Sequence, residues 1–124
     1  MLRALIVEDD PSFRYAFKRV LHERLPCIVI EEVGNGEEAL QRIKEAPPDF
    51  IFVDMRLGGM DGLELVQKIK KDFPFTRIAM LTGYDLPKYR RTASQYGVDR
   101  YFLKDSLDWK GIEEFVQSIP IGNR

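Results

Sequence analysis

Short apolar runs that alternate with longer segments of helical period constrain the fold of this chain most strongly. Five such runs can be counted, at 4–7, 27–31, 50–53, 78–81 and 101–103. Repeated strand and helix units of this kind are typical of an α/β domain built around a parallel sheet. The first, third and fourth runs are almost continuously apolar, as strands covered on both faces should be.

Residues that start or stop helices separate the five runs. These signals bound five expected helices, and they lie at Pro11-Ser12, Asn35, Pro47-Pro48, Asp61-Gly62, Pro87, Gly97 and Pro120. Right-handed crossovers between parallel strands leave few topologies. The simplest is a flavodoxin-like, doubly wound, five-stranded parallel sheet of order 2-1-3-4-5 with five helices. Ligands of such a sheet bind beyond the carboxyl ends of the strands, at the switch point between strands 1 and 3.

Length and charge exclude several classes of function. The 124 residues suit one domain, and a formal net charge of -1 gives no basic field for nucleic acid or an anionic membrane. We therefore expect no direct nucleic-acid binding and no membrane association. The single cysteine, Cys27, stands in an apolar run, so we expect a buried free thiol. Acids interrupt the first apolar run too soon for a signal peptide, and a cytoplasmic location is expected.

Acidic side chains follow the first and third expected strands directly. Strand 1 runs into Glu8-Asp9-Asp10, and strand 3 ends in Asp54. If these strands are neighbours, the carboxylates converge in one crevice, where like charges need a cation or a shared proton. Oxygen ligands of this kind suit Mg²⁺. The alternative is that Asp9 and Asp10 merely stabilise the N-terminus of the first helix.

A hydroxyl and an ammonium are expected at the same rim. Strand 4 ends in Thr82 and strand 5 is followed by Lys104. Each alone is more often structural or a solvated surface group. Together with Asp54 they form a set that suits phosphoryl transfer, because a carboxylate nucleophile needs a divalent ion and fixed donors around the phosphoryl oxygens.

These motifs together resemble the receiver domain of bacterial response regulators, including chemotaxis-type receivers. The matching segments are Ile6 to Pro11, Val53 to Leu57 with Gly59 to Gly62, Leu81-Thr82-Gly83 and Tyr101 to Lys104. The resemblance extends from Leu5 to about Ile119, so residues 1–124 are expected to form one receiver domain. It implies that this domain accepts a phosphoryl group from a histidine kinase, assisted by Mg²⁺, and thereby controls an output.

The resemblance also assigns roles to single residues. Asp54 would be phosphorylated, and Glu8, Asp9, Asp54 and the carbonyl of Arg56 would hold the metal. Thr82 and Lys104 would act on the phosphoryl group. Tyr101 would be the rotating aromatic residue that switches with Thr82, although it could equally be a rim residue without that role. Arg56 and Tyr84 occupy positions that tune dephosphorylation in the family, and their bulk predicts a long-lived phosphorylated state.

The implied partners are a histidine kinase or phosphotransfer protein, and an output domain or partner on the face of helix 4, strand 5 and helix 5. A homodimer on phosphorylation is a further expectation. The domain would catalyse its own phosphorylation and dephosphorylation, with no turnover of an external substrate. Lys88, Arg90 and Arg91 form a basic face on helix 4, either simply solvated or in contact with an acidic partner.

Two positions depart from the family pattern. Gly58 stands where members usually have proline, which predicts a more mobile loop. Asp105 replaces the proline that commonly follows the lysine, so the Lys104-Asp105 bond is expected to be trans. Lys104-Asp105-Ser106 resembles the variant found in receivers attached to helix-turn-helix output domains.

Three other functions remain open at this point. A flavin- or nucleotide-phosphate module would need a glycine- or hydroxyl-rich loop after strand 1, where this chain has acids. A phosphatase with an aspartyl-phosphate intermediate would place a second acid two residues after its nucleophile, where this chain has Arg56. A pseudo-receiver that works only through protein contacts would keep the same site without using it.

Overall fold

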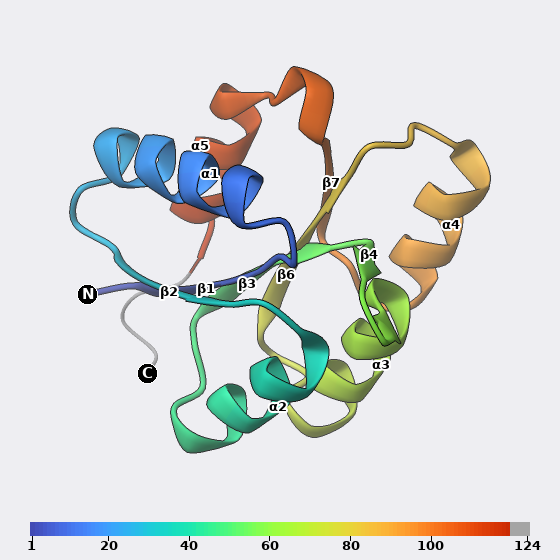
Figure 1. Ribbon diagram of the computed structural model, residues 1–124. Coiled ribbons are helices and arrows are strands. Elements are labelled where there is room, and N and C mark those ends of the chain that lie inside the picture. The colour runs from blue at the N-terminus through green and yellow to red at the C-terminus, as the bar shows by residue number, and fades with distance from the viewer. Residues whose placement is uncertain (120–124) are drawn as a thin grey trace.

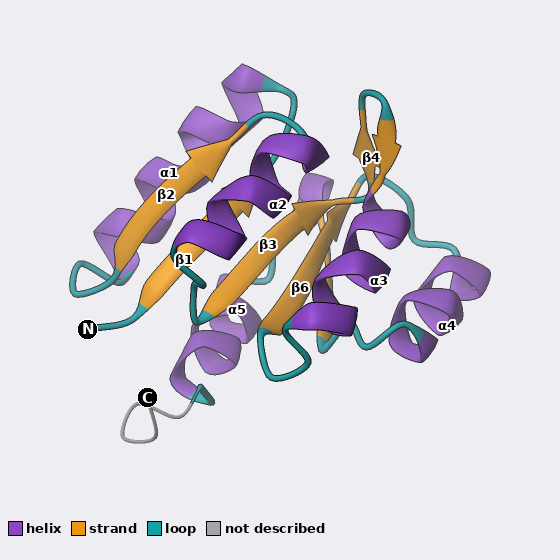
Figure 2. Ribbon diagram, turned by 90° about the horizontal axis from the view of Figure 1, so that it is seen from below, coloured by secondary structure: helices purple, strands orange, loops and turns teal. Residues whose placement is uncertain are grey.

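Five parallel strands form the centre of the molecule, and a computed structural model describes residues 1–119. The strands are β1 (Arg3–Val7), β2 (Val29–Val33), β3 (Phe50–Asp54), β6 (Arg77–Thr82) and β7 (Arg100–Leu103). Their order in the sheet is β2-β1-β3-β6-β7, and every neighbouring pair is parallel (Figure 2). This is the predicted 2-1-3-4-5 order, so the flavodoxin-like fold is confirmed.

Helices cover both faces of the sheet, as a sheet of parallel strands requires. On one face lie α1 (Pro11–Arg24) and α5 (Trp109–Gln117), and on the other lie α2 (Gly36–Glu45), α3 (Gly62–Asp72) and α4 (Pro87–Gln95) (Figure 1). Successive strand residues point to opposite faces, so neighbouring side chains enter different cores. Ile6 packs with the α1 and α5 layer, whereas Leu5 and Val7 pack with the α2 and α3 layer.

Aromatic rings fill the core between the sheet and the α1 and α5 layer. The ring of Phe17 on α1 lies 5.0 Å from that of Phe52 and 5.3 Å from that of Trp109. Phe50, Phe52 and Phe115 pack edge to face on one another. Edge-to-face pairs add to the stabilisation that burial alone provides. Trp109 therefore covers the edge of this core.

Side-chain caps fix where four of the helices begin. Asp10 accepts from the backbone N–H of Ser12 at 3.0 Å, and Asn35, Asp61 and Asp108 cap α2, α3 and α5 in the same way. Such caps satisfy N–H groups that the helix itself leaves unpaired. The helix α4 differs, because Leu86 provides no side-chain cap and Ala93 is the one fully buried residue of this helix.

The second strand was predicted two residues too early. It spans Val29–Val33 rather than 27–31, and Cys27 lies before it as an exposed thiol, so the expectation of a buried cysteine was wrong. Ion pairs explain the shift. Glu31 binds Arg3 and Arg42, at 2.7 and 3.0 Å, so this acid can lie in a strand at the edge of the sheet.

Two further features complete the described chain. A short hairpin, β4 (Arg56–Leu57) and β5 (Met60–Asp61), follows β3 and was not predicted. The peptide bonds between described residues are all trans, including the one after Lys104, as expected. A three-residue turn of 3-10 helix, η1 (Lys104–Ser106), begins at that lysine.

The predicted helix stop at Pro120 lies outside the described residues. No helix within 1–119 is long and apolar enough to cross a membrane.

Candidate functional site

Strand register brings the predicted site residues to one rim of the sheet. Val7 pairs with Val53, so the residues that follow them, Glu8 and Asp54, lie side by side. On the other side of β3, Asp54 pairs with Leu81. Thr82 in turn pairs with Leu103, which brings Lys104 to the same rim. An open cleft of about 430 Å³ lies over this rim.

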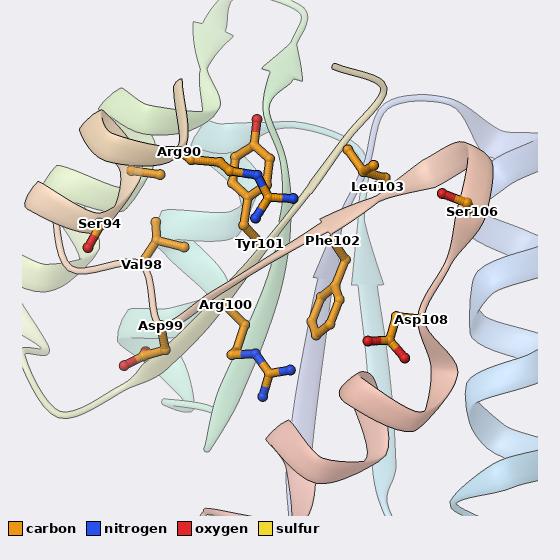
Figure 3. Close-up of a pocket in the computed structure, with 11 residues that line it drawn as sticks. Arg90, Ser94, Val98, Asp99, Arg100, Tyr101, Phe102, Leu103, Ser106 and Asp108 are labelled. Atoms are coloured by element: carbon orange, nitrogen blue, oxygen red, sulfur yellow. The ribbon is translucent and has the colours of Figure 1, made fainter. Parts of the chain in front are cut away.

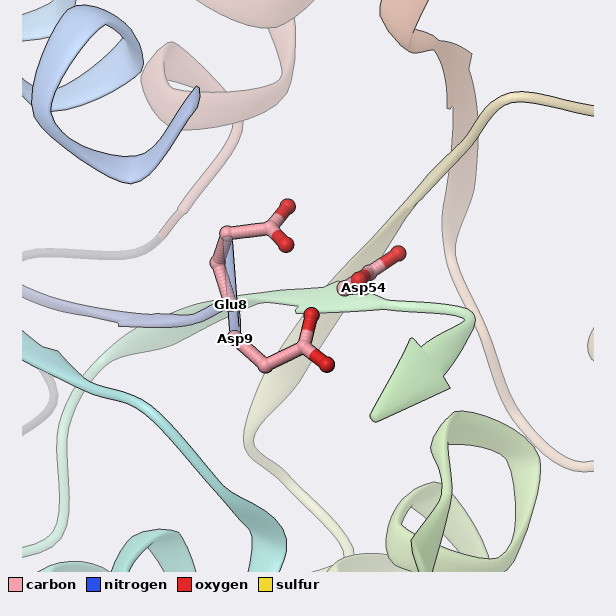
Figure 4. A group of neighbouring side chains, drawn as sticks. All are labelled: Glu8, Asp9 and Asp54. Carbon is pink, nitrogen blue, oxygen red and sulfur yellow. The ribbon is translucent and has the colours of Figure 1, made fainter. Parts of the chain in front are cut away.

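Three carboxylates converge in the cleft (Figure 4). Glu8 is completely buried, Asp54 is 5 % exposed and Asp9 is exposed. One oxygen of each lies within 4.8 Å of the others. This donor set contains only oxygen atoms, and the exposed Asp9 leaves room for water ligands, so the residues present fit Mg²⁺. Asp10, the fourth acid considered, caps α1 by accepting from the backbone N–H groups of Ser12 and Phe13.

Lys104 reaches both buried acids. Its Nζ lies 2.6 Å from Glu8 Oε1 and 3.1 Å from Asp54 Oδ1. The same ammonium lies 4.7 Å from the centre of the Phe13 ring, a contact that sequence analysis missed. Burial lowers the pKa of Lys104, but the hydrogen bond to Glu8 and the charge of Asp54 outweigh it and leave that pKa raised. Lys104 is therefore a fixed positive charge beside Asp54.

Glu8 is the group whose protonation the site perturbs most clearly. Burial raises the pKa of Glu8 from 4.5 to about 7, against the opposing effect of Lys104 and with the help of the neighbouring Asp54 carboxyl. Two carboxylates in one buried pocket resist simultaneous ionisation. In the metal-free protein, part of the Glu8 population therefore carries a proton near neutral pH.

Backbone N–H groups of the hairpin orient the other two acids. Arg56 N donates to Asp54 Oδ1 at 3.3 Å, and Gly58 N donates to Asp9 Oδ2 at 3.2 Å. The second bond uses an N–H that a proline at this position would lack. Asp9 thus lies in the cleft, as expected of a metal ligand. Asp10 caps α1, as the helix-cap alternative expected.

Gly62 sets how closely α3 approaches Asp54, and sequence analysis assigned this glycine only to a helix start. A Cβ at this position would overlap the carbonyl oxygens of Asp54 and Met55. Gly62 N also donates to the carbonyl of Met55 at 2.8 Å. The Asp61-Gly62 pair is the signal that could have indicated this contact, since glycine permits close backbone approach.

Thr82 and Tyr84 connect the cleft with the surface next to α4. Thr82 is buried, and its Oγ1 donates to Met55 Sδ at 3.7 Å and accepts from Tyr84 N at 3.1 Å. The Arg56 guanidinium lies 4.6 Å from the centre of the Tyr84 ring. The carbonyl of Tyr84 accepts from Tyr101 Oη at 2.9 Å. Tyr84 therefore contacts the other three residues that sequence analysis assigned to switching or dephosphorylation, namely Thr82, Tyr101 and Arg56.

Comparison with known proteins agrees with this geometry. Residues 4–116 match the family model of the response regulator receiver domain. The response regulator protein VraR of Staphylococcus aureus is 34% identical over 103 residues, which cover 83% of this chain and 49% of that protein. The VraR protein of Staphylococcus saprophyticus is also 34% identical, with the same coverage. The chain spans about half the length of these curated relatives.

Solved structures show the same architecture. A DNA-binding response regulator of the LuxR family from Staphylococcus aureus superposes with a TM-score of 0.84 at 25% identity, covering 94% of this chain and 97% of that one. The receiver domain of a response regulator, NarL, from Mycobacterium tuberculosis gives a TM-score of 0.81 at 27% identity, covering 94% of this chain and 97% of that one. The sequence match, the sheet order and the rim of acids agree, and this chain belongs to the response regulator receiver family.

Proposed function

We propose that Asp54 accepts a phosphoryl group from the phosphohistidine of a kinase or phosphotransfer protein. The observation that carries this proposal is the position of Lys104 Nζ, 3.1 Å from Asp54 Oδ1 and 2.6 Å from Glu8 Oε1 in a pocket of acids. Asp54 is nearly buried yet lines the open cleft. A carboxylate held between a fixed cation and a metal-binding pair is suited to attack phosphorus.

The reaction forms a bond between a carboxylate oxygen of Asp54 and phosphorus, and breaks the bond from phosphorus to a histidine nitrogen. Mg²⁺, held by Glu8, Asp9, Asp54 and the Arg56 carbonyl, would neutralise the phosphoryl oxygens. Lys104 supplies a second positive charge, and the Thr82 hydroxyl, which also lines the cleft, supplies a hydrogen-bond donor. Burial of Glu8 and Asp54 strengthens each of these interactions.

Phosphorylation would act on the face formed by α4, β7 and α5. The Thr82 hydroxyl now bonds Met55 Sδ and Tyr84 N, and it must leave these partners to reach a phosphoryl oxygen. That movement would free space and contacts for Tyr101, shifting an equilibrium that exists without phosphate. NMR shift changes should then spread from Asp54 through Thr82 to Tyr101 and α4. Changes confined to the loops of the cleft would contradict this route.

The partners of the whole protein follow from this proposal. Since the chain spans half of its curated relatives, and one solved relative is described as a DNA-binding response regulator, a DNA-binding output domain is the partner we propose for the output face. The phosphatase alternative is weakened because the residue two positions after Asp54 is Arg56, a cation that lies over the Tyr84 ring, and not an acid.

Intact-mass measurement tests the proposal. Incubation with phosphoramidate or acetyl phosphate and Mg²⁺ should add one phosphoryl group to the protein, and Asp54→Asn should abolish the addition. Asp72→Asn is the matched control, because Asp72 is an exposed residue at the end of α3. Labelling that persists in Asp54→Asn would falsify the assignment, and an unlabelled wild type would favour the pseudo-receiver alternative.

A further inference from the structure

The backbone just before Asp9 is held by a side chain of α1. The ladder between β1 and β2 ends at the pair Val7 and Val33, and Glu8 N then donates to the Val33 carbonyl at 3.1 Å. The Glu8 carbonyl lies beyond the last strand pair, and it accepts from Arg14 Nη1 at 2.7 Å. Arg14 thus takes the place of a strand partner at the point where the chain enters the cleft.

Arg14 is fixed in turn by an acid of β2. Its Nε donates to Glu32 Oε1 at 3.2 Å, so the guanidinium joins α1, β2 and the end of β1. Gly34, which follows β2, leaves room for this side chain, because a Cβ there would lie 3.2 Å from Arg14 Nη1. The two bonds use different nitrogens of one planar guanidinium, a geometry that the ammonium of a lysine does not reproduce.

The peptide groups on both sides of Asp9 are therefore held. Before it, the Glu8 carbonyl binds Arg14, and after it, Asp10 N donates to Glu8 Oε2 at 3.1 Å. Asp9 itself is exposed, so the backbone sets the direction from which its carboxylate enters the cleft (Figure 4). The bond from Arg14 uses no carboxylate oxygen, so it remains in place when a cation binds the carboxylates.

We infer that Arg14, held by Glu32, is a positioning residue for the cation site, because it fixes the Glu8–Asp9 peptide that joins two of the acids. The inference rests on the proposed function, since the cation is the Mg²⁺ of that proposal. Arg14 and Glu32 both lie outside the lining of the cleft. Loss of such an outer partner typically weakens metal binding about 10–100-fold, because the ligands lose their orientation.

The direction of the effect separates positioning from simple charge. Arg14 is a cation next to acids that would bind another cation, so its charge alone opposes Mg²⁺ binding. If repulsion were its only effect, removal of Arg14 would strengthen the binding. Positioning predicts the opposite, because the Glu8–Asp9 peptide must then be ordered when the metal binds.

Calorimetric titration with Mg²⁺ tests the inference. Arg14→Met keeps the aliphatic stem and removes every donor, and it should weaken Mg²⁺ binding about tenfold or more. Arg14→Lys keeps the charge without the planar fork, and it should weaken binding by a smaller factor. Unchanged or tighter binding in Arg14→Met would overturn the inference. Wild-type affinity in Arg14→Lys would overturn the need for both bonds of the guanidinium.

A double variant tests the part assigned to Glu32. Glu32→Met removes the acceptor that holds Arg14, and it should also weaken Mg²⁺ binding. Because Glu32 acts through Arg14, the protein with both changes should bind no more weakly than Arg14→Met alone. Independent contributions of the two residues would multiply in the double variant, and that result would overturn the role of Glu32.

Two variants control for the loss of a positive charge. Lys18 binds the other oxygen of Glu32 at 2.9 Å, one turn further along α1, and Lys18→Met should keep the affinity within about twofold of wild type. Arg100 begins β7 and lines a separate groove of about 500 Å³ beside α4 and the start of α5 (Figure 3), so Arg100→Met should have no effect. A loss in either control equal to that in Arg14→Met would overturn the assignment to Arg14.

A second measurement needs no metal. The residual dipolar coupling of the Asp9 N–H reports the orientation of the Glu8–Asp9 peptide. Arg14→Met should change this coupling and leave those of β3 as in the wild type, whereas Lys18→Met should change neither. Urea unfolding without divalent ions shows whether each variant is folded, and Arg14→Lys supplies the comparison if Arg14→Met is not. An unchanged Asp9 coupling in the folded variant would overturn the positioning role.

The outcomes separate the inference from the proposed function. A wild type that binds Mg²⁺ and is labelled at Asp54, with unchanged affinity in Arg14→Met, would overturn the inference and leave phosphotransfer intact. A wild type that binds no Mg²⁺ would refute the metal site of the proposed function. The Asp9 coupling would then still show whether Arg14 holds the peptide.

Discussion

The metal-free protein is expected to lose stability as the pH rises from about 5 to about 8, because Glu8 holds its proton longer in the folded state. Glu8 has a folded pKa of about 7 against an ordinary value of 4.5. Below pH 4.5 both states bind the proton, and between these two values the unfolded chain releases it first. Deprotonation therefore favours unfolding between these two pKa values. The stabilisation that Glu8 provides is fully present below pH 4.5.

The size of the effect follows from the width of the window. A difference of 4.5 against about 7 corresponds to on the order of 3 kcal/mol in the free energy of unfolding. The Glu8 side chain is buried, so solvent screens its charge only weakly. Lys104 stays charged across the same range because its pKa is raised. The loss of stability with rising pH therefore comes from Glu8 and not from Lys104.

Urea unfolding at several pH values, without divalent ions, measures the effect. The wild type should lose most of that free energy across the window, whereas Glu8→Gln should show a flatter curve because its amide cannot titrate. The difference between the two curves cancels the other groups that titrate there. Mg²⁺ should restore the stability of the wild type above pH 7, where it replaces the proton. Parallel curves for the two proteins would refute a protonated Glu8 in the folded state.

Three further predictions concern the cleft and its support. Asp9→Ala should weaken Mg²⁺ binding, measured by calorimetry, because Asp9 is the exposed acid of the cluster; unchanged affinity would exclude it as a ligand. Arg56→Asn and Tyr84→Ala should each speed the loss of phosphate after donor removal, because their stacked side chains rim the cleft; the shielding argument fails if neither does, or if the wild type decays within seconds. Gly62→Ala should destabilise the fold by about 1–3 kcal/mol in urea, because its Cβ would overlap the backbone of Asp54, whereas Gly83→Ala meets open space and should not.

The fold was predictable because most of its signals are local. The runs that form β1, β3 and β6 are continuously apolar, and the residues that end them define the rim. From parallel order alone, Glu8, Asp54 and Lys104 had to meet. Their distances, and the raised pKa of Glu8, depend on burial that no sequence pattern reports.

The errors arose where distant residues decide local structure. The strand β2 contains Glu31 and Glu32, and its apolar start suggested an earlier strand. Arg14 and Lys18, both on α1, bind Glu32 at 3.2 and 2.9 Å, so tertiary ion pairs stabilise acids in this strand. The contacts of Tyr101 with Tyr84 and Arg90 were equally hidden, because they join a loop, α4 and β7.

The weak attachment of α4 has a consequence for hydrogen exchange. This helix buries only Ala93 fully, lacks a side-chain cap, and carries Lys88, Arg90 and Arg91 in its first half, where the helix dipole disfavours cations. Local opening of such a segment costs far less free energy than global unfolding. Amides of α4 should therefore exchange with deuterium through local fluctuations, while those of β3 wait for the whole domain to unfold. The proposed signalling through this helix would then act on a weakly anchored segment, so a modest change at its N-terminal end should alter its exchange rate.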